Sequence, residues 1–169
     1  MDAPISLTFQ VSLPYLAADP DSRPLPRLPI RLALSESDRR LGRLWPLLDT
    51  GADYTMFDGA VAVELGWTEA DIASRAEDVR PVSGVGRGAG PLTGYLHRLT
   101  CYVPLGARYA VLPLRVLLTP PYTLATPVLG RHDFFAQVDF GLAEAERRCY
   151  LRVRDPAAVH AAWTAESGR

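Results

Sequence analysis

An aspartate ends a short apolar run and is followed at once by small residues. The run 44–48 leads into Asp49, and Thr50, Gly51 and Ala52 come next. Because these residues carry little bulk, we predict a tight turn at the edge of the core, where backbone N–H groups reach the Asp49 carboxylate. Two such carboxylates held side by side share one proton, so that one activates water while the other donates a proton. The same tripeptide also fits an ordinary turn without a chemical role.

A second stretch is rich in glycine and lies between two predicted strands. At the tip of segment 81–94 the sequence reads Gly84-Val85-Gly86-Arg87-Gly88-Ala89-Gly90. The spacing formally matches the dinucleotide-binding pattern G-x-G-x-x-A, but that pattern must open a helix, and Pro91 follows here. The stretch is therefore interpreted as the connection between the two strands.

A third stretch places glycine and arginine directly after apolar residues. It reads Pro127-Val128-Leu129-Gly130-Arg131-His132 and continues with Asp-Phe-Phe. His132 is not accompanied by a serine or cysteine in a nucleophile-elbow pattern, so we interpret it as a loop or helix-start residue.

Taken in order, these motifs resemble the retropepsin-like (retroviral-type) aspartic proteases, in their cellular and bacterial branch. The family's first motif, two hydrophobic residues followed by Asp-Thr-Gly-Ala-Asp/Ser, is matched by residues 47–53. An apolar helix ending in Leu-Gly follows it, as in 58–66, and the family's flap hairpin corresponds to 81–94. The second signature, Ile/Val-Leu/Ile-Gly-Arg, corresponds to 128–131. The resemblance implies a mostly β fold, namely the retropepsin-like acid-protease β-barrel with one or two short helices and a flap hairpin.

The resemblance also implies a role for each matching residue. Asp49 becomes the catalytic acid, Thr50 links two active-site turns through its hydroxyl, and Gly51 helps to bind the substrate backbone. Asp53 pairs with Arg131 and holds the turn in place, the alternative being a surface ion pair of little value. The remaining residues with an implied role are Ala52 in the active-site turn and the flap residues that close over a peptide, Ser83, Gly84, Val85, Gly86 and Arg87.

The chemistry needs two carboxylates, whereas the sequence contains one Asp-Thr-Gly. The resemblance therefore implies a homodimer to which each chain contributes Asp49. Its implied function is that of an aspartic endopeptidase acting on peptide or protein substrates, with no metal and no other cofactor. Because chain ends interleave at the dimer interface of the viral relatives, residues 5–13 and 148–153 are the candidate interface strands.

A second hypothesis stays open, that of a non-catalytic module which keeps the retropepsin fold for peptide binding or assembly. It is motivated by the single acid, by Arg87 near the flap tip where viral flaps are apolar, and by long segments before Asp49 and before Gly130. This hypothesis predicts a monomer, or a dimer in which the two Asp49 carboxyl groups lie too far apart to share a proton.

The elements that must position these residues are predicted to be mostly strands. Alternating apolar and polar side chains predict a strand at 6–13, with 29–35 as its hairpin partner. The same patterns predict strands at 79–85, 92–103, 109–118, 128–129, 137–140 and 148–153.

Helices are predicted at three short segments. Apolar residues at Phe57, Val61 and Leu65 follow helical spacing, with Asp58 and Gly66 as the caps. A capping box formed by Thr68 and Asp71 predicts a second helix at 68–76, and a third is expected at 133–136. Residues 1–154 are expected to form the protease-like domain, and 155–169 a C-terminal helix or tail.

Composition limits the class of protein. The chain has 169 residues, enough for about one domain. Its net charge of -1 removes the basic footprint of a nucleic-acid binder, and 15 prolines with 13 glycines are too many for a helical bundle.

Targeting and redox signals indicate a cytoplasmic protein without membrane association. The first residues lack a basic segment, and the chain contains no apolar run of about 18 residues. Cys101 and Cys149 are expected to be buried and reduced, with a single disulfide as the alternative. The cysteines and histidines show no zinc-ligand spacing, so no metal site is expected.

Overall fold

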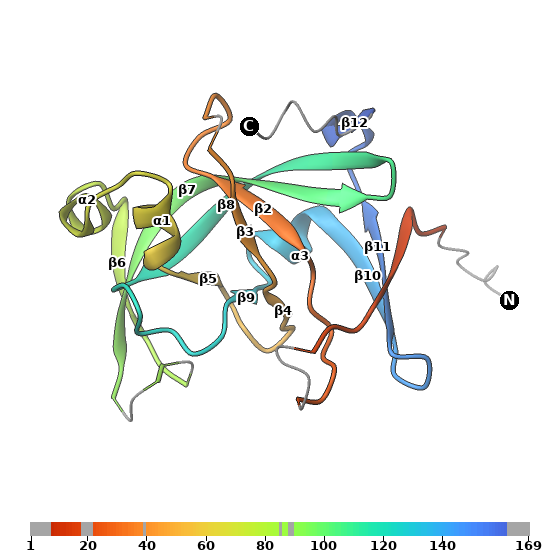
Figure 1. Ribbon diagram of the computed structural model, residues 1–169, viewed down its shortest axis with the longest axis horizontal. Helices are drawn as coiled ribbons and strands as arrows, with labels where there is room; N and C mark the ends of the chain where they lie inside the picture. The colour runs from red at the N-terminus through yellow and green to blue at the C-terminus, as the bar shows by residue number, and fades with distance from the viewer. Residues whose placement is uncertain (1–7, 18–21, 39, 85, 88–89, 162–169) are drawn as a thin grey trace, which may run out of the picture.

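The computed structural model describes residues 8–17, 22–38, 40–84, 86–87 and 90–161, and this part of the chain is mostly β, as predicted (Figure 1). The strands are β1 (Val11–Pro14), β2 (Ile30–Ala33), β3 (Gly42–Leu44), β4 (Leu47–Leu48), β5 (Thr55–Asp58), β6 (Asp78–Val82), β7 (Leu92–Leu105), β8 (Arg108–Thr119), β9 (Val128–Leu129), β10 (Val138–Ala143), β11 (Arg148–Val153) and β12 (Val159–Ala161). The helices are α1 (Ala60–Glu64), α2 (Glu69–Ser74) and α3 (Phe134–Gln137), with a 3-10 turn at Pro156–Ala158.

Two sheets organise the described residues. The larger has the strand order β3-β2-β7-β8-β5-β9-β4, with β6 added to β7 and β12 added to β8. The smaller is antiparallel, in the order β1-β11-β10. Figure 1 shows the larger sheet curling, with α1 and α2 together beside one end of it and the β6–β7 hairpin extending below them.

The long hairpin of β7 and β8 forms the middle of the larger sheet. These strands pair from Tyr95 opposite Leu118 to Leu105 opposite Arg108, and Gly106 turns the chain with a φ of 69°. Side chains of one face, including Leu99, are buried in the main core. In the half of the hairpin nearest Gly106, buried and more exposed side chains alternate along both strands. This period-2 pattern is why the sequence predicted both strands close to their observed bounds.

A smaller hydrophobic cluster lies apart from the main core. It consists of one buried residue from each of six segments, and its members are Met56, Val82, Leu96, Leu117, Leu124 and Val128. Ala52 and Tyr54 pack against it. The segment that follows Asp49 therefore packs on a hydrophobic cluster that is separate from the main core.

The N-terminal strands pair differently from the prediction. The predicted hairpin between 6–13 and 29–35 does not form. Instead, β2 pairs with β3 and β7, and β1 pairs with β11. Alternating side chains show which face of a strand is buried, but they do not determine which strand it pairs with. Of the two segments expected at a dimer interface, 148–153 pairs through β11 with β1, which contains residues 11–13 of the segment 5–13; residues 5–7 lie outside the described part.

The helices begin and end close to the predicted positions, with one correction. Phe57 lies on β5, where it is fully buried and pairs in parallel with Leu118, so it is not part of the helix. Gly66 follows α1 with a φ of 108°, a conformation that favours glycine. The capping box of Thr68 and Asp71 is confirmed at the start of α2.

The C-terminal segment also differs from the prediction. In place of a helix or tail after residue 154, the chain forms the 3-10 turn and then β12, which pairs with β8. Residues 162–169 lie outside the described part. Cys101 and Cys149 are both buried and free, as predicted, and burial raises the pKa of both thiols. Among the described helices, none has the length and apolar character needed to span a bilayer.

His97 on β7 is buried where α2 packs on the sheet. Its Nε2 atom lies 2.8 Å from the carbonyl oxygen of Ile72, and its ring meets the Trp67 ring edge-on at a centroid distance of 4.9 Å. Burial lowers the pKa of His97, and the Ile72 carbonyl and the Glu77 charge only partly oppose this effect. A neutral imidazole therefore ties α2 to the sheet.

We expect the free energy of unfolding to fall as the pH drops below about 6.5, the ordinary pKa of histidine, because the unfolded chain then binds a proton that buried His97 excludes. In a His97→Gln variant this part of the pH dependence should be lost, since the amide keeps an N–H for Ile72 and does not titrate. Urea unfolding of both proteins at about pH 7 and pH 5.5 measures the difference. Equal losses in the two proteins would contradict the expectation.

Candidate active site

Asp49 follows β4 directly, on a turn that closes around its carboxylate. β4 runs parallel to β9, and the Asp49 N–H donates to the Leu129 carbonyl at 3.2 Å. The Gly51 N–H donates to Asp49 Oδ1 at 2.9 Å, as the sequence predicts for a tight turn. Asp49 is half-buried, while Thr50 and Gly51 are exposed. One carboxylate oxygen is therefore fixed by the backbone, and the turn presents its tip to the surface.

The segment after β9 holds this turn from the other side. Arg131 N–H donates to the Ala52 carbonyl and His132 N–H to the Asp53 carbonyl, both at 2.9 Å. The Gly130 N–H donates to the buried Thr55 hydroxyl at 3.1 Å. The two sequence motifs, whose bonded residues lie 75 to 79 positions apart, thus form one hydrogen-bonded unit.

Gly130 is required at its position by close approach. A Cβ atom there would overlap the carbonyl group of Tyr54 and lie 2.8 Å from the Thr55 backbone nitrogen. Backbone atoms offer no flexible end that could move aside, so any side chain at Gly130 forces the strands apart. This contact gives a physical reason for glycine in the second motif.

The structure brings Asp53 and Arg131 together, with Arg131 Nη2 at 2.5 Å from Asp53 Oδ1. The hydrogen bond and the positive charge of Arg131 lower the pKa of Asp53. Both side chains are more than half exposed, at 57% for Asp53 and 58% for Arg131. At that exposure the pair fits the surface-ion-pair interpretation, because water screens it.

We expect an Arg131→Ala variant to unfold at nearly the same urea concentration as the unmodified chain. The exposed ion pair contributes little, and the backbone hydrogen bonds from Arg131 and His132 to the turn remain. Urea unfolding near neutral pH measures the effect. A large fall in the unfolding midpoint would instead show that the guanidinium itself holds the turn.

The β6–β7 hairpin faces the Asp49 turn across a cavity of about 420 Å³. Asp49, Gly51 and Ala52 line one side, and Ser83 and Gly84 line the other. Val85 lies outside the described residues. Of the predicted flap residues in the described part, Ser83 and Gly84 are therefore the ones placed against the cavity.

The tip of the hairpin is fastened to the loop after β8. Gly86 forms a β-bridge with Leu124, and the Arg87 backbone N–H donates to the Thr123 carbonyl at 2.9 Å. The Arg87 side chain also donates from Nε to the Leu124 carbonyl at 3.1 Å. The Arg87 side chain near the tip of the hairpin thus has a structural partner.

Asp58 is the residue near the site whose contacts sequence reasoning missed. It was predicted as the N-cap of the first helix, but the N-cap of α1 is Gly59, and Asp58 ends β5. From there its Oδ1 accepts the Ala60 N–H at 2.9 Å. The same carboxylate also accepts the N–H groups of Tyr122 at 2.7 Å and Leu124 at 2.9 Å. Asp58 therefore anchors the loop that holds the flap tip. Nothing local in the sequence marks this role, because its partners lie more than 60 positions away.

Among the described residues that line the cavity, Asp49 is the carboxylate without an ion pair to arginine. Asp53 lines it as well, but Arg131 holds its carboxylate. Among the described residues, no group of three or more His, Cys, Asp or Glu side chains could hold a metal ion. No protein-family model matches the sequence, and a search of curated proteins finds no match.

Proposed function

We propose that this chain is a retropepsin-like aspartic endopeptidase that acts as a homodimer. The observation that carries the proposal is the Asp49 carboxylate, held on an exposed Asp-Thr-Gly turn and facing a cavity that the β6–β7 hairpin covers. A second support is the way Gly130 and its neighbours brace that turn, which joins the two motifs on which the family resemblance rests.

In the proposed reaction the two Asp49 carboxyl groups of a dimer share one proton. The ionised carboxylate takes a proton from water as the water oxygen adds to the peptide carbonyl carbon. The protonated carboxyl group gives its proton to the carbonyl oxygen. Collapse of the tetrahedral intermediate then breaks the C–N bond: the protonated carboxyl group gives its proton to the leaving nitrogen, and a hydroxyl group of the intermediate gives its proton to the ionised carboxylate, which restores the shared proton.

The exposure of the turn supports a partner chain at this place. Thr50 and Gly51 form the tip of the turn and are exposed in the single chain. A second copy related by twofold symmetry would bring the same turn against this one, because such an interface joins identical surfaces. Each Thr50 hydroxyl could then donate to the opposite turn, as the resemblance implies.

The alternative function, a non-catalytic peptide-binding or assembly module, has one observation in its favour. The flap tip is already fastened to the loop after β8 through Gly86 and Arg87. A hairpin fixed in this way would hold a peptide without needing to open and close during turnover. Peptide binding without cleavage would favour this alternative.

The test is cleavage of a peptide library between about pH 4 and pH 7, with the unmodified chain and an Asp49→Asn variant at several protein concentrations. The proposal expects cleavage that rises more steeply than linearly with concentration and disappears in the variant. It also expects a mildly acidic optimum, because the dyad must hold one proton. Equal cleavage by the Asp49→Asn variant would overturn the proposal.

A further inference from the structure

The Asp49 turn is bordered, on the side away from β9, by a short segment that runs antiparallel to β4. In this ladder Arg27 forms a β-bridge with Leu47. The same register sets Leu25 opposite Asp49, since each lies two positions beyond a member of the bridge. Neighbouring strands lie about 5 Å apart, which places Leu25 within side-chain reach of the Asp49 turn.

Leu25 is held firmly while its side chain stays partly exposed. Its N–H donates to the Leu16 carbonyl at 3.0 Å, and its own carbonyl accepts the Leu16 N–H at 2.9 Å. The side chain of Leu25 is nevertheless 36% exposed. Because two hydrogen bonds fix the backbone at this point, the fold itself presents an apolar side chain beside the turn.

The segment 24–26 is suited to burial against another protein. It reads Pro-Leu-Pro, without a charged side chain, and proline has no backbone N–H. The one N–H of the segment, that of Leu25, is bonded to Leu16, and the Pro26 carbonyl accepts the Leu48 N–H at 2.8 Å. Covering the segment would therefore remove apolar surface from water without leaving an N–H unpaired.

The other sides of Asp49 are taken up by the chain itself and by the cavity. The Asp49 N–H donates to the Leu129 carbonyl on β9, and the cavity separates the turn from the β6–β7 hairpin. Thr50 and Gly51 at the tip of the turn are exposed, and Leu25 borders the turn on the side away from β9. A second carboxylate can therefore approach Asp49 over the turn tip and the segment 24–26.

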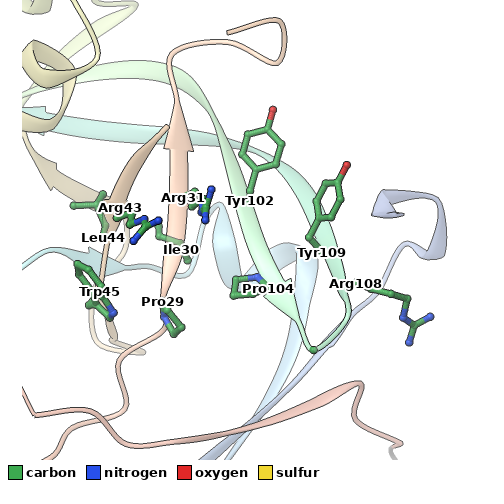
Figure 2. A pocket seen from close by; sticks show the side chains of 11 residues that line it. Pro29, Ile30, Arg31, Arg43, Leu44, Trp45, Tyr102, Pro104, Arg108 and Tyr109 are labelled. Atoms are coloured by element: carbon green, nitrogen blue, oxygen red, sulfur yellow. The ribbon is translucent and has the colours of Figure 1, made fainter. Parts of the chain in front are cut away.

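Trp45, another exposed apolar side chain of the same ladder, belongs to a different part of the surface. Together with Pro29 it lines a cavity of about 390 Å³, to which β2, β3, β7 and β8 also contribute (Figure 2). Among the described residues that line this cavity, neither Leu25 nor Asp49 is found. Trp45 thus marks the far end of the ladder, and Leu25 marks the end at the Asp49 turn.

We propose that Leu25 and the tip of the Asp49 turn form the surface on which a second copy of this chain docks. A twofold dimer buries the same surface of both chains, so that Leu25 is covered in each of them. This inference rests on the proposed function, because the dyad is what requires a second Asp49 at this place. It names the interface as the segment 24–26 in place of 5–13 and 148–153, which the resemblance implied.

The experiment measures self-association of the full-length chain by sedimentation velocity over about a hundredfold range of protein concentration. Leu25→Glu and Leu25→Lys each place a charge on the surface, and either charge must lose its water on docking. Leu25→Met keeps the apolar character. The matched control is Leu142→Glu on β10 of the smaller sheet, where the leucine is 41% exposed. Circular dichroism verifies that each variant is folded.

We expect the unmodified chain, Leu25→Met and Leu142→Glu to dimerise alike. In Leu25→Glu and Leu25→Lys the dissociation constant of the dimer should rise at least about tenfold. A chain that is monomeric at every concentration would overturn the proposal, as would folded Leu25→Glu and Leu25→Lys variants that dimerise as tightly as the unmodified chain. Dissociation by Leu142→Glu alone would place the interface on the smaller sheet and would also overturn it.

Cleavage measured in the same samples separates this proposal from the proposed function. A dimer that Leu25→Glu dissociates, formed by a chain that cleaves no peptide, would overturn the proposed function and leave this interface standing. Cleavage that depends on Asp49, by a dimer that Leu25→Glu leaves unchanged, would overturn this interface and leave the proposed function standing.

Discussion

The Asp49→Asn variant is expected to cleave the substrates of the unmodified chain more slowly by at least three orders of magnitude, a loss on the order of those measured when a reacting residue is removed from other hydrolases. The amide of asparagine cannot take a proton from water, and it cannot hold the proton that the dyad shares. The change is nearly isosteric, so the turn should keep its shape: the side-chain oxygen can still accept the Gly51 N–H. Initial rates on a library-derived peptide measure the loss.

Mixing the two chains separates a shared dyad from a site complete in one chain. If each active dimer needs Asp49 from both chains, about a ninefold excess of the Asp49→Asn chain should lower activity per unmodified chain about tenfold, because random pairing leaves few unmodified dimers. The mixture must first be allowed to exchange subunits. Activity per unmodified chain that stays constant would show that each chain acts alone, and it would overturn the homodimeric dyad.

A matched control tests whether any loss of a carboxylate has the same effect. Asp155 is exposed, and its Oδ1 accepts the Ala157 N–H at the 3-10 turn, outside the cavity at Asp49. An Asp155→Asn variant makes the same chemical change and should retain full cleavage. Full activity in this variant beside lost activity in Asp49→Asn would assign the effect to the turn after β4.

The parts of the fold that the sequence predicted are those that local rules determine. Thr68 and Asp71 form a capping box because their spacing alone brings each side chain to the other's backbone N–H. The alternation along β7 and β8 marks their strands, since one face of each packs on the core. Asp49 and Gly51 meet within one turn, so their contact is also encoded locally.

The parts that the sequence did not predict depend on which distant segments meet. The pairing of β1 with β11 joins segments more than 130 positions apart, and alternation does not determine which strands pair. Asp58 was predicted as a helix N-cap, a position that Gly59 takes, and its contacts with Tyr122 and Leu124 exist only once β5 lies beside β8. In the same way, Arg31 and Arg43 become neighbours only through the β2–β3 register.

Replacing Gly130 by alanine is expected to lower the free energy of unfolding by more than about 2 kcal/mol, a typical cost of forcing atoms into a packed interior. The new Cβ would overlap the Tyr54 carbonyl group. The two segments cannot move apart without breaking hydrogen bonds. The Gly130 N–H donates to the Thr55 hydroxyl, and the Arg131 N–H donates to the Ala52 carbonyl. The turn at Asp49 should therefore be displaced, and cleavage lost with it.

Gly90 provides the matched control for this substitution. A Cβ added there meets no atom of the described residues within 4 Å, and no left-handed φ marks this glycine. Gly90→Ala should therefore leave the urea midpoint nearly unchanged, while Gly130→Ala lowers it. If Gly130→Ala proved as stable as Gly90→Ala, the strands around the turn would be able to separate without cost. The close approach of Gly130 to Tyr54 would then no longer explain why glycine precedes arginine in the second motif.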